Sequence, residues 1–283
     1  MAERFVFMPL LGIILAVVIW CLDAAGLLLA KKMNMASIGL LSLTNIIFFA
    51  QSIIRNRDWE SNKTLFASAT ENTPNSSRAH YNYGTVLLNE SLAGTVDEMP
   101  AALEQLTIAK EINPNNYLQY FNLGVANYHL GKYNEAVAIL SKAVSEIPND
   151  TIQLINLADA YVKVKAYDSA VVYYKKAYSG KAWSPDSYNK YASSLFSLQK
   201  YKDAQLIFEK GLTVDSTNAE LWMNYGNTMA VQQKYQPAIA AFEKTLSIDP
   251  SRKQALYFLA ITWKSLGDNT KAEAYYKQFQ LSK

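Results

Sequence analysis

Cysteine and histidine are scarce in this sequence. A single cysteine, Cys21, and two histidines, His80 and His129, occur among its 283 residues. One cysteine excludes an internal disulfide, and so few sulfur and imidazole ligands exclude a thiolate zinc cluster and most histidine-based metal sites. We therefore expect the chain to bind no metal and to need no cofactor.

A strong charge of either sign is also missing. The 27 basic and 24 acidic residues leave a formal net charge of +3, and nucleic-acid binding needs clustered lysine and arginine instead. The sequence has no glycine-rich phosphate loop and no nucleophile–base pair. Cys21 falls in an apolar segment, and His80 and His129 fall on helical segments where packing explains them. We expect no nucleic-acid partner and no catalytic residue in this chain alone.

Charged residues are absent from two long apolar stretches near the N-terminus. None occurs from Phe5 to Leu22 or across residues 33–54. A helix needs about 20 apolar residues to cross the hydrocarbon core of a bilayer. The rival interpretations are a cleaved signal peptide and a buried soluble core. The apolar core of a signal peptide is shorter than the first stretch, and a buried helical hairpin would need a surrounding domain to cover it, whereas no other part of the sequence is apolar all round. We expect two transmembrane helices, at about 5–30 and 33–54, that anchor residues 1–58 in a lipid bilayer.

Beyond this apolar beginning the sequence repeats itself every 34 residues. Small residues recur at this interval in two positions: Gly124, Ala158, Ala192, Gly226 and Ala260 in the first, and Ala136, Ala170, Ala204, Ala238 and Ala272 in the second. The spacing and the two small positions resemble the tetratricopeptide repeat, in which small residues let paired helices approach closely. The remainder is therefore predicted to be an all-α solenoid, a right-handed superhelix of helix pairs.

The period also predicts how the solenoid is divided. We expect a capping helix and linker over residues 59–76, followed by a repeat domain over residues 77–283. Its six repeats are expected at 77–116, 117–150, 151–184, 185–218, 219–252 and 253–283. The first repeat fits if a six-residue insertion lengthens the turn between its two helices, which costs little closure entropy.

Asparagine recurs on the first helix of the repeats, two residues before the small position. The predicted ladder is Asn82, Asn122, Asn156 and Asn224, interrupted by Lys190 and Phe258. An asparagine amide offers a donor and an acceptor, so a row of them can pair with the backbone of an extended polypeptide. The predicted lining of the same concave groove is Tyr81, Phe121, Tyr128 and Asp159. The alternative is that asparagine is simply common at this position.

Two segments resemble a known enzyme family. MAERFVFMPLLG at residues 1–12 and RNRDWESNKTLFASATENTPNSSRAHYNYG at residues 55–84 are similar to the transmembrane and tetratricopeptide-repeat O-mannosyltransferases and their bacterial relatives. The resemblance implies an integral membrane protein of the bacterial inner membrane, with the repeats on the extracytoplasmic side holding an acceptor protein. The family topology opposes the lysine and arginine count, which favours cytoplasmic termini, and we follow the family.

Two functions remain open at this point. The first is a membrane-anchored tetratricopeptide module that binds an extended protein or peptide segment and does no chemistry. The second is the acceptor-binding C-terminal part of a membrane O-glycosyltransferase of the polyprenyl-phosphate-mannose type. In that case the catalytic membrane domain is expected to be absent from this chain, because only two spans are predicted where the family has many.

Overall fold

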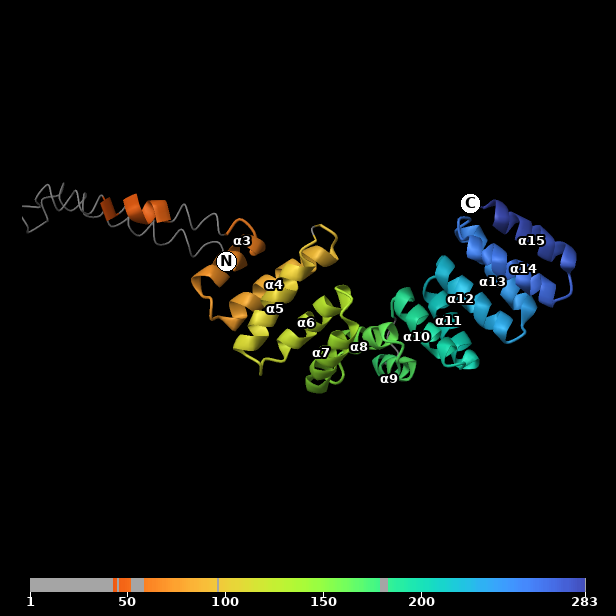
Figure 1. The fold of residues 1–283 in the computed structure, drawn as a ribbon, viewed down its shortest axis with the longest axis horizontal. Helices are drawn as coiled ribbons and strands as arrows, with labels where there is room; N and C mark the ends of the chain where they lie inside the picture. The colour runs from red at the N-terminus through yellow and green to blue at the C-terminus, as the bar shows by residue number, and fades with distance from the viewer. Residues whose placement is uncertain (1–42, 45, 52–58, 96, 179–182, 283) are drawn as a thin grey trace, which may run out of the picture. The chain divides into compact units, whose positions relative to one another are not determined.

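The computed structural model describes residues 43–44, 46–51, 59–95, 97–178 and 183–282. All regular secondary structure in these residues is helical (Figure 1). The chain divides into two compact units, Met1–Ile112 and Asn113–Lys283. The prediction of an all-α helical solenoid is confirmed.

The first unit contains a helical hairpin with one further helix against it. Its helices are α3 (Asn62–Asn72), α4 (Ser77–Leu92) and α5 (Met99–Ile112). α4 packs against both α5 and α3. Lys63 at the start of α3 ties this helix to the hairpin, because its Nζ lies 2.6 Å from Oε2 of Glu98 and 3.2 Å from Oε2 of Glu90.

The described residues of the second unit form five helical hairpins. They are α6 (Leu118–His129) with α7 (Tyr133–Glu146), α8 (Thr151–Lys163) with α9 (Tyr167–Ala177), α10 (Pro185–Ser197) with α11 (Tyr201–Val214), α12 (Ala219–Val231) with α13 (Tyr235–Ile248), and α14 (Lys253–Ser265) with α15 (Asn269–Leu281). Three of these first helices, α8, α10 and α12, begin at a polar capping residue. The side chains of Asp150, Ser184 and Asn218 each accept a hydrogen bond from a backbone N–H in the first turn of the helix that follows. The sequence therefore marks several helix starts directly.

The small repeated residues hold each hairpin together. A Cβ added to Gly124 would lie 2.6 Å from Cγ of Leu140, and one added to Gly226 would lie 2.8 Å from Cε1 of Phe242. Leu140 and Phe242, the large residues of the second helices, are fully buried. Close approach of the two helices therefore depends on a small residue in the first helix facing a large one in the second.

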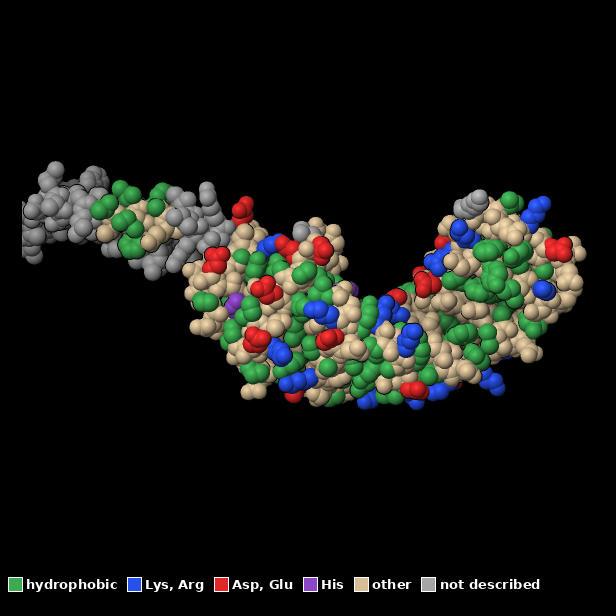
Figure 2. Space-filling view, in the orientation of Figure 1, with side chains coloured by type: hydrophobic (Ala, Val, Ile, Leu, Met, Phe, Trp, Pro, Cys, Tyr) green, Lys and Arg blue, Asp and Glu red, His purple; other side chains and the backbone are tan. Residues whose placement is uncertain are grey.

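The hairpins stack so that their first helices form one side of the unit. α6, α8, α10, α12 and α14 contact one another in succession, and each second helix contacts the first helix of the next pair. No comparable contact joins second helices in the part of the chain that the structure describes. The first helices are therefore the inner helices of the curve, as in helical solenoids generally. In Figure 2 acidic and basic side chains gather together on the hollowed side of this unit.

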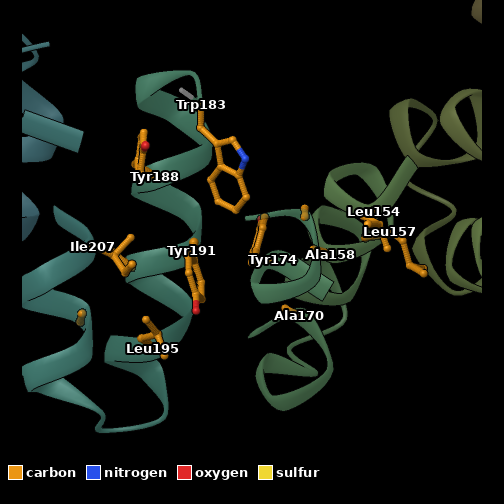
Figure 3. Close-up of a cluster of buried hydrophobic side chains, with 14 of the residues drawn as sticks. Leu154, Leu157, Ala158, Ala170, Tyr174, Trp183, Tyr188, Tyr191, Leu195 and Ile207 are labelled. Atoms are coloured by element: carbon orange, nitrogen blue, oxygen red, sulfur yellow. The ribbon is translucent and has the colours of Figure 1, made fainter. Parts of the chain in front are cut away.

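An aromatic cluster fills the junction between α9 and α10 (Figure 3). α9 has 11 residues, whereas α7, α11 and α13 have 14. Trp183, which is 5% exposed, packs beside this shortened helix. Its ring centroid lies between 5.2 and 6.2 Å from those of four tyrosines, Tyr174, Tyr178, Tyr188 and Tyr191. Trp183 therefore links α9 and α10 through contacts between aromatic rings.

The predicted membrane anchor is corrected. Range 5–30 lies outside the described residues, and of range 33–54 the structure describes residues 43–44 and 46–51, which are helical. No helix among the described residues is both long and apolar enough to cross a bilayer, since crossing needs about 20 apolar residues. The prediction of two transmembrane helices is therefore wrong, and so is the localisation to a bacterial inner membrane that rested on it.

Candidate functional site

The predicted groove residues lie on first helices, but they do not all come together. Asn122, Phe121 and Tyr128 are on α6, whereas Asn156 and Asp159 are on α8, and Asn224 is on α12 of the same unit. All six are half-buried. Tyr81 and Asn82 are on α4, in the first unit, and are also half-buried. The candidate site is therefore built from the inner helices of the second unit.

Two of the predicted asparagines are held in place by hydrogen bonds within the protein. Nδ2 of Asn156 donates to the backbone oxygen of Ile152 at 2.8 Å, one turn earlier in α8. Nδ2 of Asn224 donates to Oδ1 of Asn189 at 2.8 Å, across to α10. An asparagine side chain has two N–H donors and a carbonyl acceptor. One hydrogen bond therefore orients each amide and leaves it capacity for a ligand.

Lys190 stands where the asparagine row is interrupted, and it forms a charged cluster. Its Nζ lies 2.8 Å from Oδ2 of Asp159 on α8 and 2.7 Å from Oδ2 of Asp186, one turn earlier in α10. The hydroxyl of Tyr174 donates to the other oxygen of Asp159. The Asp159 side chain is 13% exposed, so its charge is balanced inside the protein by Lys190.

The cluster shifts the pKa values of Lys190 and Tyr174. Burial alone would lower the pKa of Lys190, but the hydrogen bond and charge of Asp159, aided by Asp186, outweigh it and raise this pKa above its ordinary value. Burial first, and then Asp159, raise the pKa of Tyr174. The ammonium and the phenol therefore both keep their protons at neutral pH.

The charges of Asp159 and Lys190 also affect Tyr128 and His129 at the end of α6. Burial first, and then the charge of Asp159, raise the pKa of Tyr128. Burial first, and then the charge of Lys190, lower the pKa of His129. The two rings meet edge to face with centroids 5.3 Å apart. At neutral pH this end of the surface offers a neutral imidazole and a neutral phenol, which suits packing against a ligand more than acid–base chemistry.

A second polar connection runs from α10 to α14. Nδ2 of Asn189 donates to Oε1 of Glu220 at 2.9 Å. Glu220 in turn lies 4.0 Å from Nη2 of Arg252, and Nε of Arg252 lies 3.0 Å from Oδ2 of Asp249. Neighbouring inner helices are thus joined through polar side chains from α8 to the start of α14.

Six residues of these connections were missed from the sequence, namely Tyr174, Asp186, Asn189, Glu220, Asp249 and Arg252. The spacing of these residues in the sequence could have indicated the pairs. Asp159 and Lys190 are 31 residues apart, and Asn189 and Asn224 are 35 residues apart. Each interval is close to one repeat, so each pair falls on adjacent first helices. In the described part of the chain, no three histidine, cysteine or acidic side chains are grouped to hold a metal ion.

Family models match the second unit in three places. Residues 120–150 and residues 230–281 match tetratricopeptide repeat models. Residues 163–245 match the model of subunit 3 of the anaphase-promoting complex, or cyclosome. The chain therefore contains tetratricopeptide repeats, the helical hairpins that stack into protein-interaction modules.

Particular proteins resemble parts of the chain. Protein O-mannosyl-transferase TMTC3 of Mus musculus is 27% identical over 137 residues, which are 48% of this chain and 14% of that protein. The chain thus matches only a small part of this relative. The sequence resemblance to O-mannosyltransferases is supported at this weak level, and the tetratricopeptide assignment is confirmed.

Solved structures share the fold. A crystal structure of MamA has a TM-score of 0.54 at 21% identity, covering 56% of this chain and 94% of MamA. MamA from Desulfovibrio magneticus RS-1, from residue 41 onward, has a TM-score of 0.56 at 17% identity, covering 59% of this chain and 95% of that one. YrrB, described as a tetratricopeptide protein with an unusual peptide-binding site, has a TM-score of 0.57 at 19% identity, covering 64% and 93%.

Proposed function

We propose that the chain binds an extended polypeptide along the inner helices of its second unit. The observation that supports this most is the fixed orientation of Asn156 and Asn224, whose amides are each held by one hydrogen bond at 2.8 Å. Side chains that are already ordered lose little conformational entropy when a ligand binds. Backbone pairing with such amides gives affinity without demanding one particular sequence.

The surroundings of the two amides suit the same ligand. Phe121 and Tyr128 offer half-buried rings on α6, and Asp159 is already neutralised by Lys190. Aromatic faces beside polar groups with defined directions are typical of sites for peptides and small ligands. The peptide-binding site named for YrrB supports the proposal at the level of the fold.

The test is a double substitution at the two ordered amides. A mixed library of fluorescent peptides of about ten residues, roughly the length that spans several repeats as an extended strand, is screened against the full chain by anisotropy. Asn156→Ala with Asn224→Ala is expected to weaken the tightest binders by about tenfold, since each lost hydrogen bond contributes about 0.5–1.5 kcal/mol.

The matched control places the same change on second helices. Asn134 on α7 and Asn269 on α15 are both exposed, so Asn134→Ala with Asn269→Ala should leave peptide affinity unchanged. Equal affinity of the wild type and the inner-helix variant for every bound peptide would contradict the role of the amides. Absence of any bound peptide would contradict the proposed function as a whole.

A second candidate function rests on the similarity to Protein O-mannosyl-transferase TMTC3. In this proposal the same surface holds the acceptor polypeptide of an O-glycosyltransferase, and the catalysis takes place outside this chain. Peptides selected from the library should then be enriched in serine and threonine, and mannosylated copies should bind more weakly than unmodified ones. If the selected peptides are not enriched in serine and threonine, this second function is rejected and binding of peptides in general remains.

A further inference from the structure

Four residues at one repeat position form a row across the inner helices. Leu118, Ile152, Asp186 and Glu220 are each 34 residues apart and lie at the starts of α6, α8, α10 and α12. All four are exposed: 52% of Leu118 and 63% of Ile152 as whole residues, and 67% of the Asp186 and 52% of the Glu220 side chain. Because these helices contact one another in succession, equivalent positions lie side by side along the row.

One half of the row is apolar. Leu118 and Ile152 lie on the same helix faces as Phe121 and Ile155, three residues further along, and these two are half-buried and pack against the core. The exposed aliphatic side chains therefore continue the core outward to the surface. Exposed apolar groups that adjoin one another in this way are typical of binding surfaces.

The other half of the row has more negative than positive charge. Lys190 contacts two carboxylates, Asp159 and Asp186. Arg252 likewise contacts two carboxylates, Glu220 and Asp249. Each cation is shared by two anions, so one negative charge is left over in each group.

The exposed carboxylates of these two groups are Asp186 and Glu220, which both belong to the row. An acidic residue in the first turn also stabilises its own helix through the helix dipole, which is the structural explanation for Asp186 and Glu220. That explanation does not account for Leu118 and Ile152, which take the same position in the two preceding inner helices.

We infer that the row selects an extended peptide with an aliphatic side chain and a lysine or arginine about six residues apart. The aliphatic group packs on Leu118 and Ile152, and the cation pairs with Asp186 and Glu220. The middle of the apolar half and the middle of the acidic half are two helix spacings apart, about 16–20 Å at about 8–10 Å each. An extended chain rises about 3.3 Å per residue and alternates its side chains between two faces. Two side chains about six residues apart therefore reach both halves from one face of the peptide. The inference rests on the proposed function and adds the chemical class of the partner.

The probes are fluorescent peptides of about ten residues in a serine and threonine background. One pair has leucine and arginine about six residues apart, in either order along the chain. Two further pairs replace arginine by glutamate or leucine by serine. We expect the leucine–arginine peptides to bind the full chain about tenfold more tightly than the glutamate peptides, with a difference that shrinks as salt is raised.

Charge reversal on the protein tests the assignment of the row. Asp186→Lys with Glu220→Lys should remove the preference for arginine over glutamate or invert it. Ile152→Ser should reduce binding of the leucine peptides and leave the serine peptides unchanged. The control is Glu135→Lys with Glu146→Lys, which makes the same charge change at exposed positions of α7 and should keep the preference for arginine.

The outcomes separate this inference from the proposed function. One outcome overturns the inference and leaves the proposed function standing. In that outcome peptides bind the wild type, they bind the Asn156→Ala with Asn224→Ala variant more weakly, and the arginine and glutamate peptides bind with the same affinity. A preference for arginine that survives Asp186→Lys with Glu220→Lys also overturns it. If no peptide binds the wild type, both fail together.

Discussion

Lys190 on α10 reaches back to Asp159 on α8, with Nζ 2.8 Å from Oδ2. The pair joins two consecutive hairpins through charged side chains. The other hairpins of this unit have asparagine, serine, valine, isoleucine or phenylalanine at these two positions. Tyr174 completes the group by donating to the same carboxylate. The surface of the inner helices therefore combines a regular helical repeat with side-chain pairs that occur only at particular hairpins.

Removal of the lysine should expose the energetic importance of this pair. Lys190→Met leaves the carboxylate of Asp159, 13% exposed, without its cation, and we expect a loss of about 1–2 kcal/mol in the free energy of unfolding, reduced by the partial exposure of the lysine. Urea unfolding measures the loss. Asp159→Asn combined with Lys190→Met should be less destabilising than the sum of the single changes by about 1 kcal/mol; strict additivity would argue against coupling.

The same cluster predicts a dependence of stability on alkaline pH. The pKa of Tyr174 is raised above 10.0 and that of Lys190 above 10.5 in the folded protein. A folded state that holds protons more tightly than the unfolded state is fully stabilised below the unfolded pKa and loses this contribution as pH rises above it. We expect the urea concentration at the unfolding midpoint to fall as the pH rises above about 10, and to fall less steeply in Tyr174→Phe. Equal slopes would contradict the shift at Tyr174.

The small position of the first helix should tolerate no branched side chain. A Cβ on Gly226 would already lie 2.8 Å from Cε1 of Phe242 and 3.1 Å from Cβ of Ala241. Gly226→Val therefore forces the hairpin α12–α13 apart, with an expected cost of about 1–3 kcal/mol, measured by thermal or urea unfolding. Ala138→Val, at an exposed position of α7, is the control and should cost well below about 1 kcal/mol.

Trp183 should be the most sensitive single position at the α9–α10 junction. It is 5% exposed and meets four tyrosine rings. Trp183→Ala should lower the free energy of unfolding by about 3–5 kcal/mol, because a buried indole leaves a large cavity. Trp222→Ala is the comparison, since Trp222 is half-buried and donates one hydrogen bond to the backbone oxygen of Ser216. A smaller loss for Trp183→Ala than for Trp222→Ala would contradict the role of the cluster.

The helical solenoid could be predicted because its packing requirement is periodic. Gly124 and Gly226 are small for a steric reason that recurs in every hairpin, and sterics of this kind leave a regular trace in the sequence. The membrane helices were inferred from the apolar content of two stretches alone, and the described residues contain no helix able to cross a bilayer. The division into six repeats with a capping segment over residues 59–76 stays a prediction.

The pairings on the inner helices could not be predicted in the same way. Lys190 appeared to interrupt the asparagine row because its partner Asp159 lies on another helix, and a period says nothing about which rotamers bring two side chains together. Asn189 was overlooked because it lies beside the row in sequence, although it accepts a hydrogen bond from Asn224. The asparagine ladder itself stays a prediction until peptide binding is measured.

These pairings also determine how far the hairpins are interchangeable. If residues 185–218 were deleted, the 34-residue period would continue unbroken, and Asp159 would face Asn224 where it now faces Lys190. The backbone would still stack, yet the half-buried carboxylate of Asp159 would be left without a cation and Asn224 without Asn189. Asp159, Lys190, Asn189 and Asn224 therefore encode the order of the hairpins along the chain, which the helical repeat by itself leaves unspecified.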